Sequence, residues 1–169
     1  KIVECPEQGG PIIARAFGIE SCSREIICCT DGDCTVDEKW IEALTKPLIK
    51  NSLISISAGY TKIQNNIFWK LSCWWQFVIN RKIINKKSHR FAWGSNFAFR
   101  KNDYDKVGGL SPFLKIHEDL KINYWAEDLY LSLALQKIGS IFFATKAIVY
   151  TYMPKEKSSI LSQKKIVIK

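Results

Sequence analysis

The sequence EIICCTDGDC, residues 25–34, decides the fold class of this chain. Residues 25–30 form a short continuous apolar run, which is typical of a β-strand covered on both faces. The run stops abruptly at Asp31-Gly32-Asp33, where a glycine between two aspartates indicates a turn. In open α/β sheets the ligand crevice lies at the carboxyl ends of the strands, so this turn is a candidate binding site.

Helices are predicted on both sides of this strand. Pro11 stands in the first turn of the preceding helix. After the turn, Thr35 and Glu38 form a capping box for a helix that runs to about Leu44, and Pro47 marks its end. The other predicted elements are the tail of a strand at 1–5, a strand at 52–59, an aromatic-rich helix at 64–84, a strand at 97–101, a short helix ended by Gly108-Gly109, a helix at 127–137, and two strands at 141–145 and 147–152. This alternation predicts an α/β sandwich with a largely parallel sheet.

Composition is that of an ordinary globular protein. With 169 residues, 47% apolar and 24% charged, we expect one domain over residues 1–154 and a basic tail at 155–169. No uncharged stretch approaches the ~20 residues needed to span a bilayer. The six cysteines include no C-x-x-C pair, which disfavours a zinc ribbon. Because no leader is visible, we expect reduced thiols in a cytoplasmic protein.

Basic residues are concentrated in the middle of the chain. Residues 49–107 carry 11 basic and 2 acidic side chains, within a net charge of +9. This block predicts a positive face that attracts phosphates or an anionic membrane, unless the lysines simply solvate the surface. Within it, residues 66–87 combine tryptophans with lysines as an interfacial helix does, although the same aromatics could pack on the sheet. No nucleic-acid-binding motif is recognisable, so we expect no nucleic-acid partner.

The two aspartates after the buried strand are candidate metal ligands. Carboxylates at Asp31 and Asp33, on backbone that turns at Gly32, can converge on one hard cation such as Mg²⁺ or Mn²⁺. The alternative is a turn with solvated carboxylates, because D-x-D occurs often by chance. The position of the pair directly after a buried strand favours the metal interpretation.

Two further acidic pairs stand later in the chain. Glu127-Asp128 begins a strong predicted helix, where a carboxylate held rigidly can act as a general base or can simply cap the helix dipole. Glu118-Asp119 is predicted to lie in a loop, next to His117. That histidine has no companion at metal-ligand spacing, so we interpret it as a surface residue.

Four sequence blocks in this order resemble the family-2 glycosyltransferases, which use nucleotide-sugar donors and the GT-A fold. The blocks are PEQGGPIIARAFGIESC (6–22), EIICCTDGDCTVDEKWIEAL (25–44), GSNFAFRKNDYDKVGGL (94–110) and AEDLYLSLALQKIG (126–139). They look like the family's Ala-Arg-x-x-Gly helix, its strand with D-x-D, its G-x-N-x-x-x-R block and its E-D-x-x-L helix. Each block alone is a weak or moderate signal, whereas the four in this order and at plausible spacing make a strong signal over about residues 6–150.

The resemblance implies a fold and a chemistry. The fold would be a GT-A-like three-layer α/β/α sandwich with a mixed, mostly parallel sheet. Asp31 and Asp33 would hold Mg²⁺ or Mn²⁺ and the donor diphosphate. Asp128 would be the general base that deprotonates the acceptor hydroxyl, with Glu127 beside it, giving inversion at the anomeric carbon.

The remaining residue roles and the partners follow from the same resemblance. Gly94 and Asn96 would shape the pocket for the donor sugar and acceptor, and Arg15 would lie near the nucleotide. The donor would be a UDP- or GDP-sugar, and the acceptor a saccharide or a lipid-linked molecule of the kind used for cell-envelope polysaccharide. A lipid-linked acceptor would bring this cytoplasmic protein to the inner face of the plasma membrane, through residues 66–87.

Some family features are not matched. The strands that normally precede the first block are not present ahead of Lys1, so the chain resembles the C-terminal two-thirds of such a domain. Thr151 and Tyr152 stand where many relatives carry a histidine. The alternative hypothesis is therefore a non-catalytic glycosyltransferase-like fragment that binds a partner or an anionic membrane surface.

Overall fold

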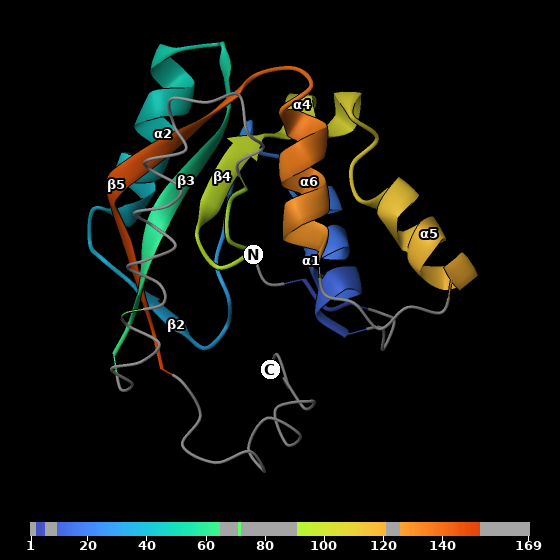
Figure 1. Cartoon of the computed structure of the whole chain (residues 1–169), viewed down its shortest axis with the longest axis horizontal. Helices are drawn as coiled ribbons and strands as arrows, with labels where there is room; N and C mark the ends of the chain where they lie inside the picture. Colours follow the sequence, from blue (N-terminus) through green and yellow to red (C-terminus); the bar gives the residue numbers. More distant parts are fainter. Residues whose placement is uncertain (1–2, 6–9, 65–70, 72–90, 121–125, 153–169) are drawn as a thin grey trace.

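The computed structural model describes residues 3–5, 10–64, 71, 91–120 and 126–152. Helices and strands are interspersed along the chain (Figure 1). The elements are α1 (Gly10–Glu20), β1 (Ile26–Cys29), β2 (Cys34–Val36), α2 (Trp40–Lys50), β3 (Ile54–Ile63), β4 (Phe97–Arg100), α4 (Lys101–Lys106), α5 (Ser111–Leu120), α6 (Glu127–Leu135) and β5 (Ser140–Thr151). The predicted α/β class is confirmed.

The sheet is mixed and has the strand order β1-β4-β3-β5-β2. β3 and β5 pair in parallel, whereas β1 with β4, β3 with β4, and β2 with β5 pair antiparallel. The mixed sheet was predicted, but among the described strands its larger share is antiparallel rather than parallel. The order of strands and helices in the sequence does not determine the strand directions. β4 and β2 run opposite to the strands beside them, and this depends on which strands become neighbours.

Three of the strands finish at the same end of the sheet. β1 is antiparallel to β4, which is antiparallel to β3, so β1, β3 and β5 all run the same way. β1 and β2 occupy opposite edges of the sheet, yet only residues 30–33 connect them. The Asp31-Gly32-Asp33 turn therefore crosses the carboxyl end of the sheet, where α/β proteins bind ligands.

Helices cover both faces of the sheet and produce two apolar cores. Along β4, Phe97 and Phe99 point into the core that contains α1 and α6, and Ala98 points into the core that contains α2. Leu44 and Leu48 of α2 are almost fully buried in that second core. In Figure 1, α2 lies on one side of the sheet and α1 and α6 lie on the other. The arrangement is the predicted three-layer α/β/α sandwich.

The helix after the turn differs from its prediction at both ends. Thr35 lies in β2, paired with Tyr150, so it does not cap a helix. Instead, the Asp37 carboxylate accepts a hydrogen bond of 3.1 Å from the Lys39 amide just before α2. Pro47 lies inside α2 rather than at its end. The apolar packing of α2 on the sheet outweighs the backbone hydrogen bond that a proline cannot donate.

Three other local predictions are corrected. Residues 3–5 form no strand, and the two strands expected at 141–145 and 147–152 are one strand, β5, with an irregular register against β3. The register shifts between Ile54 and Ile56 of β3 and again between Ala58 and Tyr60, which pair with Phe143 and Ile148 of β5. Glu118-Asp119 lies in helix α5 and not in a loop.

The strand at 52–59, the strand near 97–101, the helix ended by Gly108-Gly109 and the helix starting at Glu127 are confirmed, within a few residues at their ends. The aromatic helix at 64–84, the basic aromatic stretch 66–87 and the tail 155–169 lie outside the described residues, apart from positions 64 and 71. Within the described part of the chain, every helix is too short or too polar to cross a membrane.

Candidate functional site

The candidate site lies at the carboxyl end of β1. The chain leaves the buried residue Cys29 and turns through Asp31, Gly32 and Asp33 before β2 begins. The amide of Cys34 donates a hydrogen bond of 3.2 Å to the carbonyl oxygen of Asp31, which closes the turn. Both carboxylates are thereby presented at the end of the sheet, with Asp31 partly buried and Asp33 exposed.

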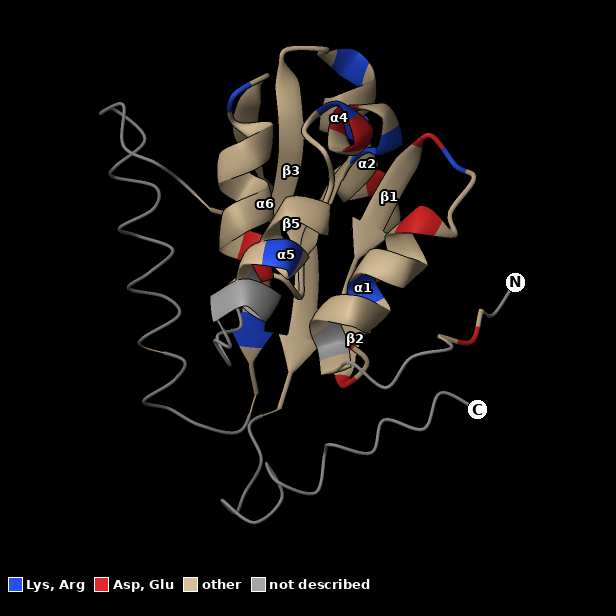
Figure 2. Cartoon of the chain, turned by 90° about the vertical axis from the view of Figure 1, so that its right-hand side faces the viewer, with Lys and Arg blue, Asp and Glu red and all other residues tan. Residues whose placement is uncertain are grey.

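Arg15 connects this turn to the start of α6. Its Nη2 donates to Oδ1 of Asp31 at 2.8 Å, and its Nη1 donates to Oε1 of Glu127 at 2.5 Å. The Arg15 side chain is 14% exposed and that of Glu127 is 8% exposed, so the ion pair between them is mostly shielded from water. Figure 2 shows the basic position on α1 and the acidic positions at the start of α6 on the same side of the sheet.

Asp128 follows Glu127 in the first turn of α6. Its Oδ2 accepts a hydrogen bond of 2.9 Å from the amide of Gly94, and its Oδ1 accepts one of 2.7 Å from the amide of Leu129. Two backbone donors therefore fix the orientation of this carboxylate. The N-terminus of a helix also favours negative charge electrostatically.

Gly94 has no side chain, and this leaves space for a neighbouring residue of the site. A Cβ at Gly94 would lie 2.7 Å from Nη1 and 3.2 Å from Nη2 of Arg15. The absence of a side chain at this position gives the guanidinium the space in which it pairs with Asp31 and Glu127. Gly94 therefore both orients Asp128 and accommodates Arg15.

Asn96 is fully buried two residues further on. Its Oδ1 accepts a hydrogen bond of 2.9 Å from Nε1 of Trp40, and its Nδ2 donates one of 3.0 Å to the carbonyl oxygen of Ala147. These bonds fix the loop before β4 to α2 and β5. The contacts of Asn96 are thus within the protein, beside the site rather than open to it.

The carboxyl of Asp31 has a raised pKa. Burial is the main cause, because it disfavours the charged form, and the negative charges of Asp33 and Asp128 act in the same direction. The Arg15 guanidinium opposes them and favours the carboxylate. The same guanidinium also pairs with Glu127, so the turn and the start of α6 lie close to each other.

The turn has donor atoms suited to a hard cation. Ligand atoms of Asp31, Asp33 and Cys34 all lie within 4.8 Å of one another. The two carboxylates are the oxygen donors that Mg²⁺ and Mn²⁺ prefer. Burial raises the pKa of the Cys34 thiol, and sulfur is a softer ligand than the oxygen donors that Mg²⁺ and Mn²⁺ prefer. The residues present therefore fit a Mg²⁺ or Mn²⁺ ion held by the two aspartates.

The structure brings together most of the residues singled out in the sequence. Arg15, Asp31, Glu127 and Asp128 are linked as described, and Gly94 contacts two of them. Sequence reasoning did not identify the pairing of Arg15 with Glu127, which are 112 positions apart and share no spacing signal.

Two further residues near the site were not singled out. Cys34 directly follows Asp33, so the sequence did place a thiol beside the aspartates. The Ser132 hydroxyl accepts a hydrogen bond of 2.9 Å from the amide of Ala92, which holds α6 against the loop that carries Gly94. Nothing in the sequence indicated that this serine, within a leucine-rich helix, would accept a hydrogen bond from the loop.

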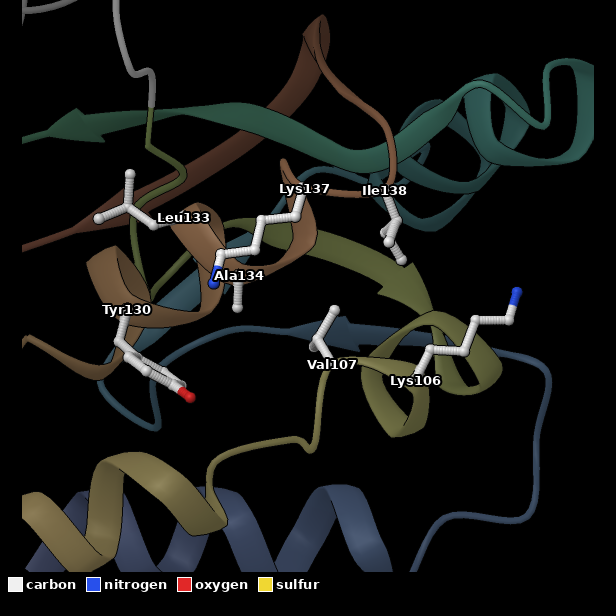
Figure 3. A pocket seen from close by; sticks show the side chains of 7 residues that line it. All are labelled: Lys106, Val107, Tyr130, Leu133, Ala134, Lys137 and Ile138. Atoms are coloured by element: carbon white, nitrogen blue, oxygen red, sulfur yellow. The ribbon is translucent and has the colours of Figure 1, made fainter.

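A separate hollow lies between the end of α4 and the C-terminal half of α6 (Figure 3). It has a volume of about 340 Å³ and is lined by Lys106, Val107, Tyr130, Leu133, Ala134, Lys137 and Ile138. None of these residues belongs to the group of carboxylates around Arg15. The hollow is therefore distinct from the candidate site.

Comparison with known proteins identifies the family. The chain is similar to a solved structure described as a crystal structure of a mycobacterial protein, with 12% identity and a TM-score of 0.44, over 98% of this chain and 51% of that one. It thus spans about half the length of that protein. No curated protein matches. The model of glycosyl transferase family 2 matches residues 1–108, which include Arg15, both aspartates of the turn and Gly94, and the chain therefore belongs to glycosyl transferase family 2.

Proposed function

We propose that this chain transfers a sugar from a nucleoside diphosphate sugar to an acceptor hydroxyl, in a single displacement that inverts the anomeric carbon. Membership of glycosyl transferase family 2 supports the general activity. The observation that carries the finer proposal is the pairing of Arg15 with both Asp31 and Glu127, which links the turn to the start of α6, where Asp128 follows Glu127. This grouping supplies carboxylates both for a cation and for proton transfer.

Asp31 and Asp33 are the residues that would hold Mg²⁺ or Mn²⁺, which offsets negative charge on the leaving diphosphate when it is bound. Asp31 has one oxygen paired with Arg15, and Asp33 is exposed at the same turn. The turn thus provides carboxylates on a short, hydrogen-bonded segment rather than on a long loop. This supports a role in binding the donor diphosphate.

Asp128 is the better candidate for the general base. Glu127 is buried, and its Oε1 is occupied by the ion pair with Arg15, so this carboxylate is poorly placed to meet an acceptor hydroxyl. Asp128 is less buried, and the two amides that hold it fix the direction of its oxygens. Its carboxylate takes the proton of the acceptor hydroxyl while that oxygen forms the new bond to the anomeric carbon. The bond from the anomeric carbon to the diphosphate breaks, and the diphosphate leaves with the electron pair.

The substrate classes belong to the same proposal. The donor is a UDP- or GDP-sugar, and the acceptor is a saccharide or a lipid-linked molecule. Asn96 supports the pocket indirectly, because its buried amide holds the loop that carries Gly94. The basic aromatic segment at 66–87 is the proposed contact with an anionic membrane surface when the acceptor is lipid-linked.

The first experiment is calorimetric titration of the full chain with UDP and with GDP, each with and without Mn²⁺. One nucleotide should bind in a Mn²⁺-dependent manner, and Asp31→Asn should weaken that binding by at least about tenfold because it removes a charged ligand. Asp105→Asn is the matched control, since Asp105 is an exposed residue of α4 paired with Lys101. Binding to Asp31→Asn that equals wild type would contradict the assignment of the donor site.

The base is tested separately, with the nucleotide sugar of the nucleoside that binds. Asp128→Asn should lower the rate of transfer by about 10²–10⁴-fold, the range typical of a lost general base, while nucleotide binding stays within about twofold of wild type. A variant that retains transfer at the wild-type rate would assign the base elsewhere.

A further inference from the structure

Arg15 joins two parts of the site that no other described ion pair connects. Its guanidinium contacts Asp31 at the end of β1 and Glu127 at the start of α6. Arg15 itself lies in α1, which packs on the sheet through Ala16 and Ile19. The guanidinium is therefore anchored by a helix of the core and not by a loop.

We propose that Arg15 is a positioning residue, which holds the Asp31-Gly32-Asp33 turn against the start of α6 and so sets the spacing between the cation-binding carboxylates and Asp128. The proposal rests on the proposed function, which gives those carboxylates their roles. A guanidinium is suited to this task because its donors point in fixed directions and can engage two carboxylates at once. A lysine ammonium is a single compact charge and lacks this fixed geometry.

Gly94 contributes to the positioning of Arg15. The backbone of Gly94 does not adopt the left-handed conformation that favours glycine, so backbone geometry does not demand a glycine there. The limited space favours glycine instead, because a Cβ at position 94 would lie 2.7 Å from Nη1 of Arg15, at the far end of a flexible side chain. Alanine at this position would therefore displace Arg15 while leaving the backbone of the loop in place.

The charges around Arg15 make the proposal testable with a cation. Arg15 is the shared cation of Asp31 and Glu127, and Asp33 and Asp128 stand next to these two carboxylates in the turn and in α6. Without Arg15, these carboxylates repel one another and the turn separates from α6. A divalent cation bound at the turn would replace part of the missing positive charge. Stability should then depend on the cation more strongly in the variant than in wild type.

The first test measures coupling without any cation, in EDTA, by urea unfolding of the full chain. Arg15→Met should raise the unfolding equilibrium constant by about tenfold or more, because it leaves a buried carboxylate unpaired. Glu127→Gln should raise the unfolding equilibrium constant strongly in wild type, but should change it by less than about twofold in the Arg15→Met background. Arg24→Met is the matched control, because Arg24 is an exposed arginine in the connection after α1. Additive effects of the two substitutions would overturn the proposal.

The second test measures thermal unfolding with and without saturating Mn²⁺. We expect Mn²⁺ to raise the Tm of Arg15→Met and of Gly94→Ala by about 5 °C more than it raises that of wild type. Gly18→Ala is the control for Gly94→Ala, because a Cβ at Gly18 of α1 meets nothing within 4 Å. A measurable increase in Tm that is the same in wild type and in all variants would overturn the proposal, since a purely structural arginine would not change the response to a cation.

Two further outcomes are also decisive. If wild type and every variant fail to respond to Mn²⁺, the metal assignment in the proposed function fails, and the coupling measured in EDTA alone decides the role of Arg15. If Arg15→Met does not fold, Arg15→Lys replaces it. Arg15→Lys keeps the positive charge but loses the fixed donor directions of the guanidinium. The coupling between residue 15 and Glu127 should therefore fall by at least about threefold relative to wild type.

Discussion

The indole Nε1 of Trp40 donates a hydrogen bond of 2.9 Å to Oδ1 of Asn96, a residue 56 positions further along the chain. Trp40 begins α2, and Asn96 precedes β4. Both side chains are buried, and Nδ2 of Asn96 donates a hydrogen bond to the carbonyl oxygen of Ala147 in β5. This pair therefore fastens the loop that carries Gly94 to the opposite layer of the sandwich.

Trp40→Phe should destabilise the fold by about 2 kcal/mol, as measured by urea unfolding. The substitution retains an aromatic ring but leaves the buried Oδ1 of Asn96 without its donor, and an unsatisfied buried acceptor costs about 1–3 kcal/mol. Trp93→Phe is the matched control, because Trp93 is only partly buried and stacks on Phe91. A loss of stability no larger than that of Trp93→Phe would show that the hydrogen bond contributes little.

Gly59→Ala should be among the most destabilising single substitutions in the sheet. A Cβ at Gly59 would overlap the side-chain amide of Asn96 and the backbone carbonyl oxygen of Ala147. The carbonyl belongs to a strand and cannot turn aside, so we expect a loss of about 3 kcal/mol in the free energy of unfolding. Gly18→Ala, which meets no atom within 4 Å in α1, should instead raise stability by about 0.5–1 kcal/mol. Equal effects of the two alanines would contradict the close packing at Gly59.

The sequence predicted the parts of the fold that depend on neighbouring residues. The apolar run of β1, the turn at Asp31-Gly32-Asp33 and the glycine stop at Gly108-Gly109 were all recognised from local patterns. The predictions that failed were those that tertiary packing decides. α2 continues through Pro47 because Leu48 is buried on the sheet, and Thr35 joins a strand because β5 lies beside it.

The candidate site shows the same division. The residue types and their order in the chain pointed to Asp31 and Asp128, and the structure links the turn of Asp31 to the start of α6, where Asp128 lies, through Arg15. No pattern in the sequence indicated that Arg15 would pair with Glu127, because the contact depends on how α1 and α6 pack on the same face. The strand directions were also beyond local patterns, since they depend on which strands become neighbours.

Two buried serines should respond in opposite ways to replacement by alanine. The Ser57 hydroxyl is buried without a hydrogen-bond partner in the described structure, so Ser57→Ala should leave stability unchanged or raise it by about 1 kcal/mol. Ser132→Ala should lower it by about 1–3 kcal/mol, because the amide of Ala92 loses its acceptor. Denaturant unfolding of both variants gives the comparison. A loss at Ser57 as large as that at Ser132 would indicate a partner for the Ser57 hydroxyl.

The cysteines should differ widely in their reactivity toward an alkylating reagent at pH 8. Cys22 is exposed, whereas burial raises the pKa of Cys28 to about 11 and raises that of Cys29 as well. Thiolates are the reactive species, so Cys28 and Cys29 should react only after unfolding, while Cys22 reacts in the native protein. Peptide mapping by mass spectrometry in native buffer and in urea assigns each rate. Cys22→Ser should remove the rate assigned to Cys22 without changing the other two.

The same two thiols predict how stability changes at alkaline pH. Their pKa values are higher in the folded chain than the ordinary value of 9.0, so the folded state binds these protons more tightly than the unfolded state. Their contribution to stability is therefore fully present below pH 9 and is lost as the pH rises toward about 11. Urea unfolding at a series of pH values should show that this loss is smaller in Cys28→Ala than in wild type. An identical pH dependence in the variant would show that the Cys28 thiol titrates alike in both states.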